Sequence, residues 1–104
     1  MKLVYSEYAL EQLQRILEFL VYKQEIPIQK ALEIRDKILD KADTIISNAY
    51  TPQREEFLEH LQLSHRRIII SNYKIVYTIK PDHVLITDIF DTRQDPDKMK
   101  GYFL

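Results

Sequence analysis

The sequence predicts an α+β fold of element order βααβββ, in which an antiparallel sheet carries an N-terminal helical hairpin on one face. Apolar residues recur at helical spacing over residues 10–46. Three short runs rich in β-branched residues follow between residues 66 and 90, with turn signals between them. The chain has 104 residues, 45% of them hydrophobic, which suits one compact domain over residues 1–104.

The first predicted elements are a short strand and a long helix. The strand covers Lys2 to Tyr5, and Ser6 is placed to cap the helix that follows. Glu7 then lies in the first turn, where a negative charge is favourable. The apolar stripe expected for this helix consists of Leu10, Leu13, Ile16, Leu17 and Leu20.

Pro27 marks the start of a second amphipathic helix, because proline suits the first helical turn. We expect this helix to reach about Ile46, and the segment 47–52 to end it. Two long helices joined by a short link form an antiparallel hairpin. The apolar positions of the second helix are Ala31, Ile34, Ile38, Leu39, Ala42, Ile45 and Ile46.

The rest of the chain is predicted to form a three-stranded meander. Residues 53–63 fit either a helical turn or an extended connector. Strands are expected at 66–70 and 73–79, paired about a two-residue turn at 71–72. The last strand is expected at 84–90.

Pairing Ile70 with Tyr73 determines which residues share a face of this sheet. A four-residue turn at 80–83 would place Asp88 on the core side, so the register of the last strand stays open. The face expected to cover the helices carries Arg66, Ile68, Ile70, Tyr73, Ile75 and Tyr77. The outer face carries His65, Arg67, Ile69, Lys74, Val76 and Thr78.

Basic residues are concentrated in this sheet, although the chain as a whole has a net charge of −1. Segment 64–80 contains Arg66, Arg67, Lys74 and Lys80 and no Asp or Glu. Such a local basic surface can bind phosphate groups, even where long-range electrostatic attraction to nucleic acid is weak.

Composition excludes several classes of protein. With no Cys, the chain has no disulfide framework, thiolate nucleophile or Cys-ligated zinc. Its three His show no metal-binding spacing, so we expect no metal and no cofactor. The sequence shows no signal-peptide pattern and no long apolar run, so we expect a cytoplasmic protein without a membrane segment.

The segment NYKIVYTI, a short turn, an aliphatic strand and FDTRQDP together resemble the RelE/ParE superfamily, the toxins of bacterial type II toxin–antitoxin systems of the plasmid-stabilisation type. The resemblance extends over nearly the whole chain. It implies a cognate antitoxin, whose helix or extended segment covers the groove between helices and sheet. It also implies two possible targets, because RelE-like members cleave messenger RNA in the ribosomal A site whereas ParE-like members poison DNA gyrase.

In the ribonuclease branch, basic residues before and after the hairpin turn and an Arg after the last strand contact the phosphate. Aligned through NYKIVY, these positions are His65, Arg67, Lys74 and Arg93. Arg67 and Arg93 suit stabilisation of the charged phosphorane, Lys74 adds a point charge, and His65 can transfer a proton. Tyr102 is the nearest match to a C-terminal catalytic residue, at a different offset.

Ordinary structural roles fit some of the same residues. Glu55, Glu56 and Glu59 can supply a general base, but their spacing is more typical of an ordinary solvated face. Asp91 can pair with Arg93. Tyr73 and Tyr77 alternate with Ile75 and are expected in the core.

The resemblance therefore favours a small toxin that cleaves translating messenger RNA through Arg67, Arg93, Lys74 and His65. The alternatives are a non-catalytic inhibitor that binds gyrase mainly through its helical hairpin and C-terminal tail, and a decayed toxin that only binds its antitoxin. The low pI and the long hairpin depart from the ribonuclease pattern, and the hairpin is closer to the ParE-like pattern.

Overall fold

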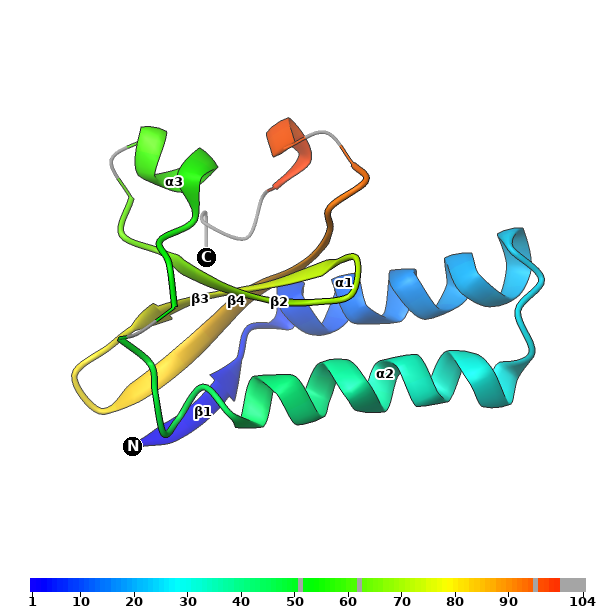
Figure 1. Ribbon diagram of the computed structural model, residues 1–104, viewed down its shortest axis with the longest axis horizontal. Coiled ribbons are helices and arrows are strands. Elements are labelled where there is room, and N and C mark those ends of the chain that lie inside the picture. Colours follow the sequence, from blue (N-terminus) through cyan, green and yellow to red (C-terminus); the bar gives the residue numbers. More distant parts are fainter. Residues whose placement is uncertain (51, 62, 95, 100–104) are drawn as a thin grey trace.

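Two layers make up the fold in the computed structural model, which describes residues 1–50, 52–61, 63–94 and 96–99. A four-stranded sheet of order β1-β4-β3-β2 forms one layer, and a helical hairpin lies against one of its faces (Figure 1). The hairpin extends well beyond the end of the sheet (Figure 1). This arrangement confirms the predicted α+β fold.

The sheet is mixed. Strands β2 (Arg66–Ile70), β3 (Tyr73–Ile79) and β4 (His83–Asp91) form the predicted antiparallel meander. Strand β1 (Lys2–Tyr5) pairs in parallel with β4. The predicted bounds of β1, β2 and β3 are confirmed, and β4 is one residue longer at each end.

A β-bulge at Thr87 determines the register of β4. The pairing with β3 shifts between Val76 and Tyr77, which leaves Thr87 as the extra residue. Beyond the bulge Asp88 pairs with Val76, and Ile89 joins the main core. A regular ladder would have placed Asp88 on the core side, so the bulge turns this carboxyl group to the opposite face.

The hairpin consists of α1 (Glu7–Glu18), a π-helical turn (Phe19–Lys23) and α2 (Ile28–Asp43). The predicted cap is confirmed, because the Ala9 amide donates to the Ser6 hydroxyl over 3.0 Å. In the described part of the chain, no helix is both long and apolar enough to cross a membrane.

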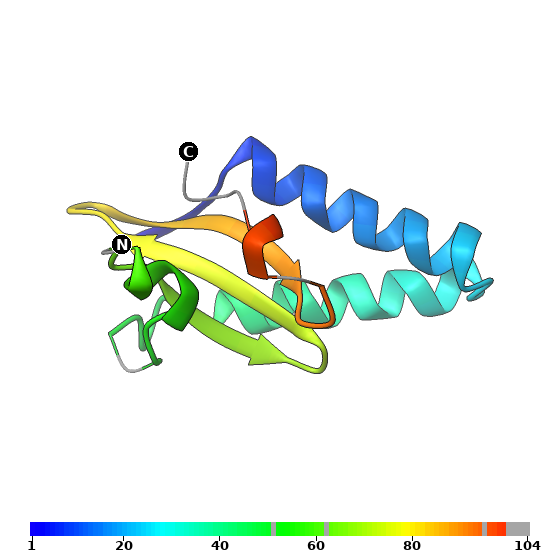
Figure 2. The ribbon, with the colours of Figure 1, turned by 90° about the horizontal axis from the view of Figure 1, so that it is seen from above.

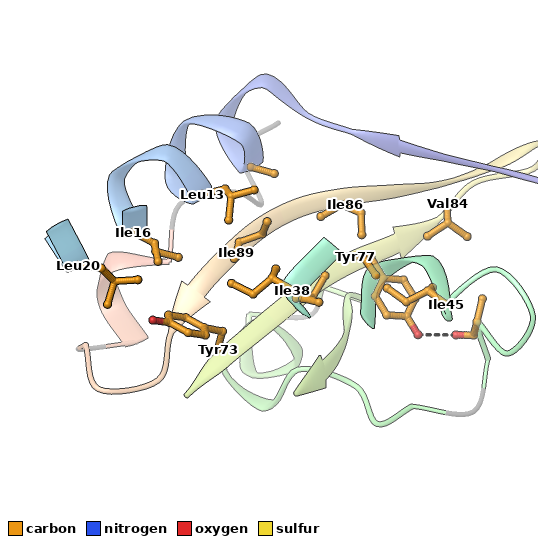
Figure 3. Close-up of a cluster of buried hydrophobic side chains, with 14 of the residues drawn as sticks. Leu13, Ile16, Leu20, Ile38, Ile45, Tyr73, Tyr77, Val84, Ile86 and Ile89 are labelled. Carbon is orange, nitrogen blue, oxygen red and sulfur yellow. Dashed lines mark hydrogen bonds between the residues drawn. The ribbon is translucent and has the colours of Figure 1, made fainter. Parts of the chain in front are cut away.

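The main core lies between the hairpin and the sheet (Figure 3). Tyr73 and Tyr77 are buried there as predicted, and the Tyr77 hydroxyl donates to the Ala49 carbonyl over 2.7 Å. The predicted stripe of α1 is partly wrong, because Leu10 is 50% exposed. The buried positions of the first helical segment, Ala9, Leu13, Ile16 and Leu20, follow a stripe that begins one residue earlier.

The link between the helices contains a residue in a left-handed conformation. Glu25 has a φ of 54°, directly after the π-helical turn. The Ile26 amide donates to the Leu20 carbonyl over 2.9 Å and closes this helix end. Glycine is the usual residue where a helix ends in this way, because a Cβ atom is strained at positive φ.

Replacing Glu25 with glycine should therefore stabilise the protein. We expect Glu25→Gly to raise the free energy of unfolding by about 0.5–1 kcal/mol, measured by urea denaturation. The control is Glu18→Gly at an exposed right-handed position of α1, which should cost about 1 kcal/mol. A loss of stability in Glu25→Gly would contradict the strain at this link.

Candidate functional site

The face of the sheet that points away from the hairpin, here called the second face, is covered by the chain. Helix α3 (Glu56–His60) and the 3₁₀ turn Pro96–Lys98 both lie over it (Figures 1 and 2). A small second core forms beneath them from Leu58, Val76, Phe90 and Met99. The prediction of an open outer face is therefore wrong, because the segment that contains α3 folds over it with a helical turn.

Backbone hydrogen bonds hold the connector before α3 against the edge of β2. The Glu55 amide donates to the His65 carbonyl over 2.9 Å, and the Arg67 amide donates to the Gln53 carbonyl over 3.0 Å. The connector therefore continues the sheet for a short distance. This pairing places the Glu55 side chain over the second face.

Glu55 lies between two of the predicted site residues. Its Oε1 atom accepts a hydrogen bond from Lys74 Nζ at 2.5 Å and is 3.6 Å from Arg67 Nη1. Its Oε2 atom accepts from the Phe57 amide over 3.1 Å and caps α3. The Glu55 side chain is 0% exposed, whereas those of Arg67 and Lys74 are 13% and 21% exposed. We call Glu55, Arg67 and Lys74 the Glu55 triad.

The guanidinium group of Arg67 has further protein partners. It donates to the Arg54 carbonyl over 2.8 Å and to Gln53 Oε1 over 3.0 Å. Arg67 and Lys74 therefore meet as expected, but an acid from outside segment 64–80 lies between them. The prediction that Glu55, Glu56 and Glu59 lie on a solvated face is wrong for Glu55, which is buried. Glu56 and Glu59 are exposed as that prediction requires.

His65 is close to the triad only through its backbone. Its side chain is buried, and Nδ1 finds no hydrogen-bond partner among the described residues. Burial lowers the pKa of the imidazole, and the positive charge of Lys80 lowers the pKa further. The local environment therefore favours neutral His65.

Arg93 belongs to a different part of the molecule. Its Nε and Nη2 atoms donate to the two carboxylate oxygens of Asp91 over 2.9 and 2.7 Å, which confirms the suggested pair. The hydrogen bond from Arg93 lowers the pKa of Asp91. Asp91 pairs across the sheet with Tyr73, whose ring packs in the main core, so Arg93 lies on the hairpin side of the sheet. Tyr102 falls outside the described residues.

A cleft of about 400 Å³ opens on the hairpin side, between α1 and the segment after β4. Ile16, Tyr73 and Ile89 give it an apolar lining, and Arg15 and Lys98 add positive charge. Sequence reasoning named the groove between helices and sheet but not these residues. Across the residues described here, no three His, Cys, Asp or Glu side chains gather where they could hold a metal ion.

Comparisons with known proteins agree with this fold. Residues 3–96 match the family described as "ParE toxin of type II toxin-antitoxin system, parDE". The structure is similar to a chain of the "Chromosomal ParDE TA system from P. aeruginosa", with a TM-score of 0.71 and 18% sequence identity over 88% of this chain and 95% of that chain. At this identity the structural likeness concerns the fold alone. No curated protein matches the sequence.

The Glu55 triad should contribute strongly to stability. Glu55→Gln keeps the size of the side chain and an acceptor for the Phe57 amide, but leaves Arg67 and Lys74 without a counter-charge. We expect the free energy of unfolding to fall by about 2–4 kcal/mol, measured by urea denaturation. The control Glu59→Gln changes an exposed acid of α3 and should cost less than about 0.5 kcal/mol. Equal losses in the two variants would contradict the triad.

The buried His65 predicts a loss of stability as the pH falls below about 6.5. The folded state holds His65 with a lowered pKa, so the unfolded chain binds the proton first and unfolding becomes easier. His65→Gln should remove this dependence. The measurement is the difference in unfolding free energy between the two proteins at about pH 7.5 and about pH 5.5. A difference that stays constant over this range would contradict the prediction.

Proposed function

We propose a function for this chain from one premise: it belongs to the ParE toxin family of type II toxin–antitoxin systems. Our proposal is that it is a cytoplasmic toxin, formed by residues 1–104 as one domain, that inhibits growth by binding DNA gyrase. Cleavage of messenger RNA, which the sequence alone favoured, becomes the alternative.

The observation that carries this proposal is the position of Glu55. A phosphate-cleaving site needs cations that are free to stabilise the extra charge on the phosphorane. Here the fully buried carboxylate of Glu55 already pairs with Arg67 and Lys74. Freeing both cations for an RNA backbone would mean displacing Glu55, which caps α3, and uncovering Leu58, which is 0% exposed. Burial of a leucine side chain is worth about 1.5–3 kcal/mol, so this opening is unfavourable.

The position of Arg93 also supports a non-catalytic toxin. Its side chain is engaged by Asp91 on the hairpin side of the sheet, whereas the Glu55 triad lies on the second face. The resemblance assigned Arg67, Lys74 and Arg93 to one phosphate. Because they lie on opposite faces of the sheet, they cannot all contact the same phosphate group. His65, the candidate for proton transfer, has its ring buried with a lowered pKa.

The hairpin offers a surface suited to a protein target. Phe19, Tyr22 and Ile28 are exposed near its far end, and Tyr22 is 78% exposed. Exposed aromatic side chains are frequent anchors of protein–protein interfaces. Contact through the hairpin is the mode that the ParE-like alternative implied.

The cognate antitoxin is expected to bind in the cleft between α1 and the segment after β4. Among the described residues that line this cleft, the one acid is Asp91, which is paired with Arg93, while Arg15 and Lys98 add positive charge. A segment with acidic and apolar side chains would fit this chemistry. This proposal places neutralisation on the hairpin side, away from the Glu55 triad.

Induced expression in a bacterial host with pulse labelling tests the target. We expect incorporation of thymidine to fall first, while incorporation of amino acids continues, and we expect the purified protein to inhibit DNA supercoiling by gyrase. The Arg93→Ala variant should be as toxic as the wild type to within about twofold, because in this proposal Arg93 does not bind a phosphate group.

The opposite pattern would overturn the proposal. An immediate stop in amino-acid incorporation, together with loss of toxicity in a folded Arg93→Ala variant, would assign the chain to the ribosome-dependent ribonucleases. The matched control is Arg35→Ala, since Arg35 also pairs with an aspartate, Asp36, on an exposed face of α2.

A further inference from the structure

The Glu55 triad has the donor arrangement of an oxyanion-binding site. Lys74 Nζ and Arg67 Nη1 approach the same oxygen of Glu55, at 2.5 and 3.6 Å. The Phe57 amide donates to the second oxygen over 3.1 Å. Arg67 is in ion-pair range of Glu55, although its guanidinium group donates to the Arg54 carbonyl and to Gln53. A hydrogen-bonding ammonium group, a neighbouring guanidinium group and a backbone N–H group around one small anion are groups that proteins use to bind phosphate.

The cations and the carboxylate come from different parts of the fold. Arg67 lies on β2 and Lys74 on β3, where cross-strand pairs with Val76 and Ile69 hold their backbones. Glu55 comes from the connector before α3, and its amide donates to the carbonyl of His65, the residue before β2. Shortening the Glu55 side chain therefore removes the anion and leaves the sheet that positions both cations.

We propose that Glu55 is the built-in occupant of a phosphate-binding site, and that its carboxylate excludes phosphate from Arg67 and Lys74. Loss of this carboxylate frees Lys74 and removes the counter-charge of Arg67. The partly exposed side chains of Arg67 and Lys74 provide an edge by which a small anion can enter without displacement of α3. The inference goes beyond the proposed function, because it assigns a class of ligand to Arg67 and Lys74 that binding to gyrase does not require.

Electrostatics supplies the driving force for binding. Without Glu55, two cations would remain on a largely covered face with no counter-charge, and the Phe57 amide would lose its acceptor. An anion that enters restores these interactions and stabilises the folded state, because a ligand that binds only the folded state raises its stability.

The test is titration of Glu55→Ala with inorganic phosphate, followed by calorimetry and by the midpoint of thermal unfolding. Sodium chloride at matched ionic strength controls for screening. We expect Glu55→Ala to bind phosphate at least about tenfold more tightly than the wild-type protein. Glu59→Ala should behave like the wild type, and Glu55→Ala/Lys74→Met should lose the gain. Equal phosphate affinity in wild type and Glu55→Ala would overturn the proposal.

A second variant and a second ligand keep the result interpretable. Glu55→Ser retains a side-chain cap for α3, so it serves if Glu55→Ala does not fold. If neither variant folds in chloride, phosphate should restore folding, and its failure to do so would overturn the proposal. A short single-stranded RNA distinguishes a site that also admits phosphodiesters from one that admits free phosphate alone. None of these results depends on the pulse-labelling experiment, so the two proposals can fail separately.

Discussion

A buried carboxylate needs partners that offset its lost hydration, and the partners of Glu55 determine the structure on the second face of the sheet. Its two oxygens engage Lys74, Arg67 and the Phe57 amide, and its own amide donates to the carbonyl of His65, the residue before β2. These contacts position α3, and α3 in turn covers the second core. Local charge balance and local packing therefore depend on the same residue, and loss of one carboxylate would disturb both.

Strand β4 allows one thin sheet to support two cores. Ile86 and Ile89 pack toward the hairpin, although three residues separate them and strict alternation would place them on opposite faces. The bulge at Thr87 corrects this alternation and turns Phe90 to the second face. The Thr87 hydroxyl donates to the Val76 carbonyl over 3.4 Å, a long hydrogen bond that spans the irregular pairing.

Most of the fold could be predicted from local signals, whereas the state of the candidate site could not. The Ser6 cap, the 71–72 turn and the alternation in β3 depend on residues close in sequence, and all three predictions are confirmed. The Glu55–Lys74 pair joins residues 19 positions apart. Helix α3 has five residues, too few for a periodic pattern, so neither its burial nor the pairing of Glu55 with Lys74 was predictable.

The acid-free composition of segment 64–80 suggested an available basic face, and this inference failed for a physical reason. Charge in a segment describes a surface only if nothing else folds onto it. Here the connector before α3 places one acid on two cations, and Asp91 engages Arg93 on the other side of the sheet. The positive charge left for a partner includes Arg15 and Lys98 at the cleft. A protein partner that presents both charge and apolar surface matches this distribution better than a phosphate backbone does, because the cleft between these cations has an apolar lining.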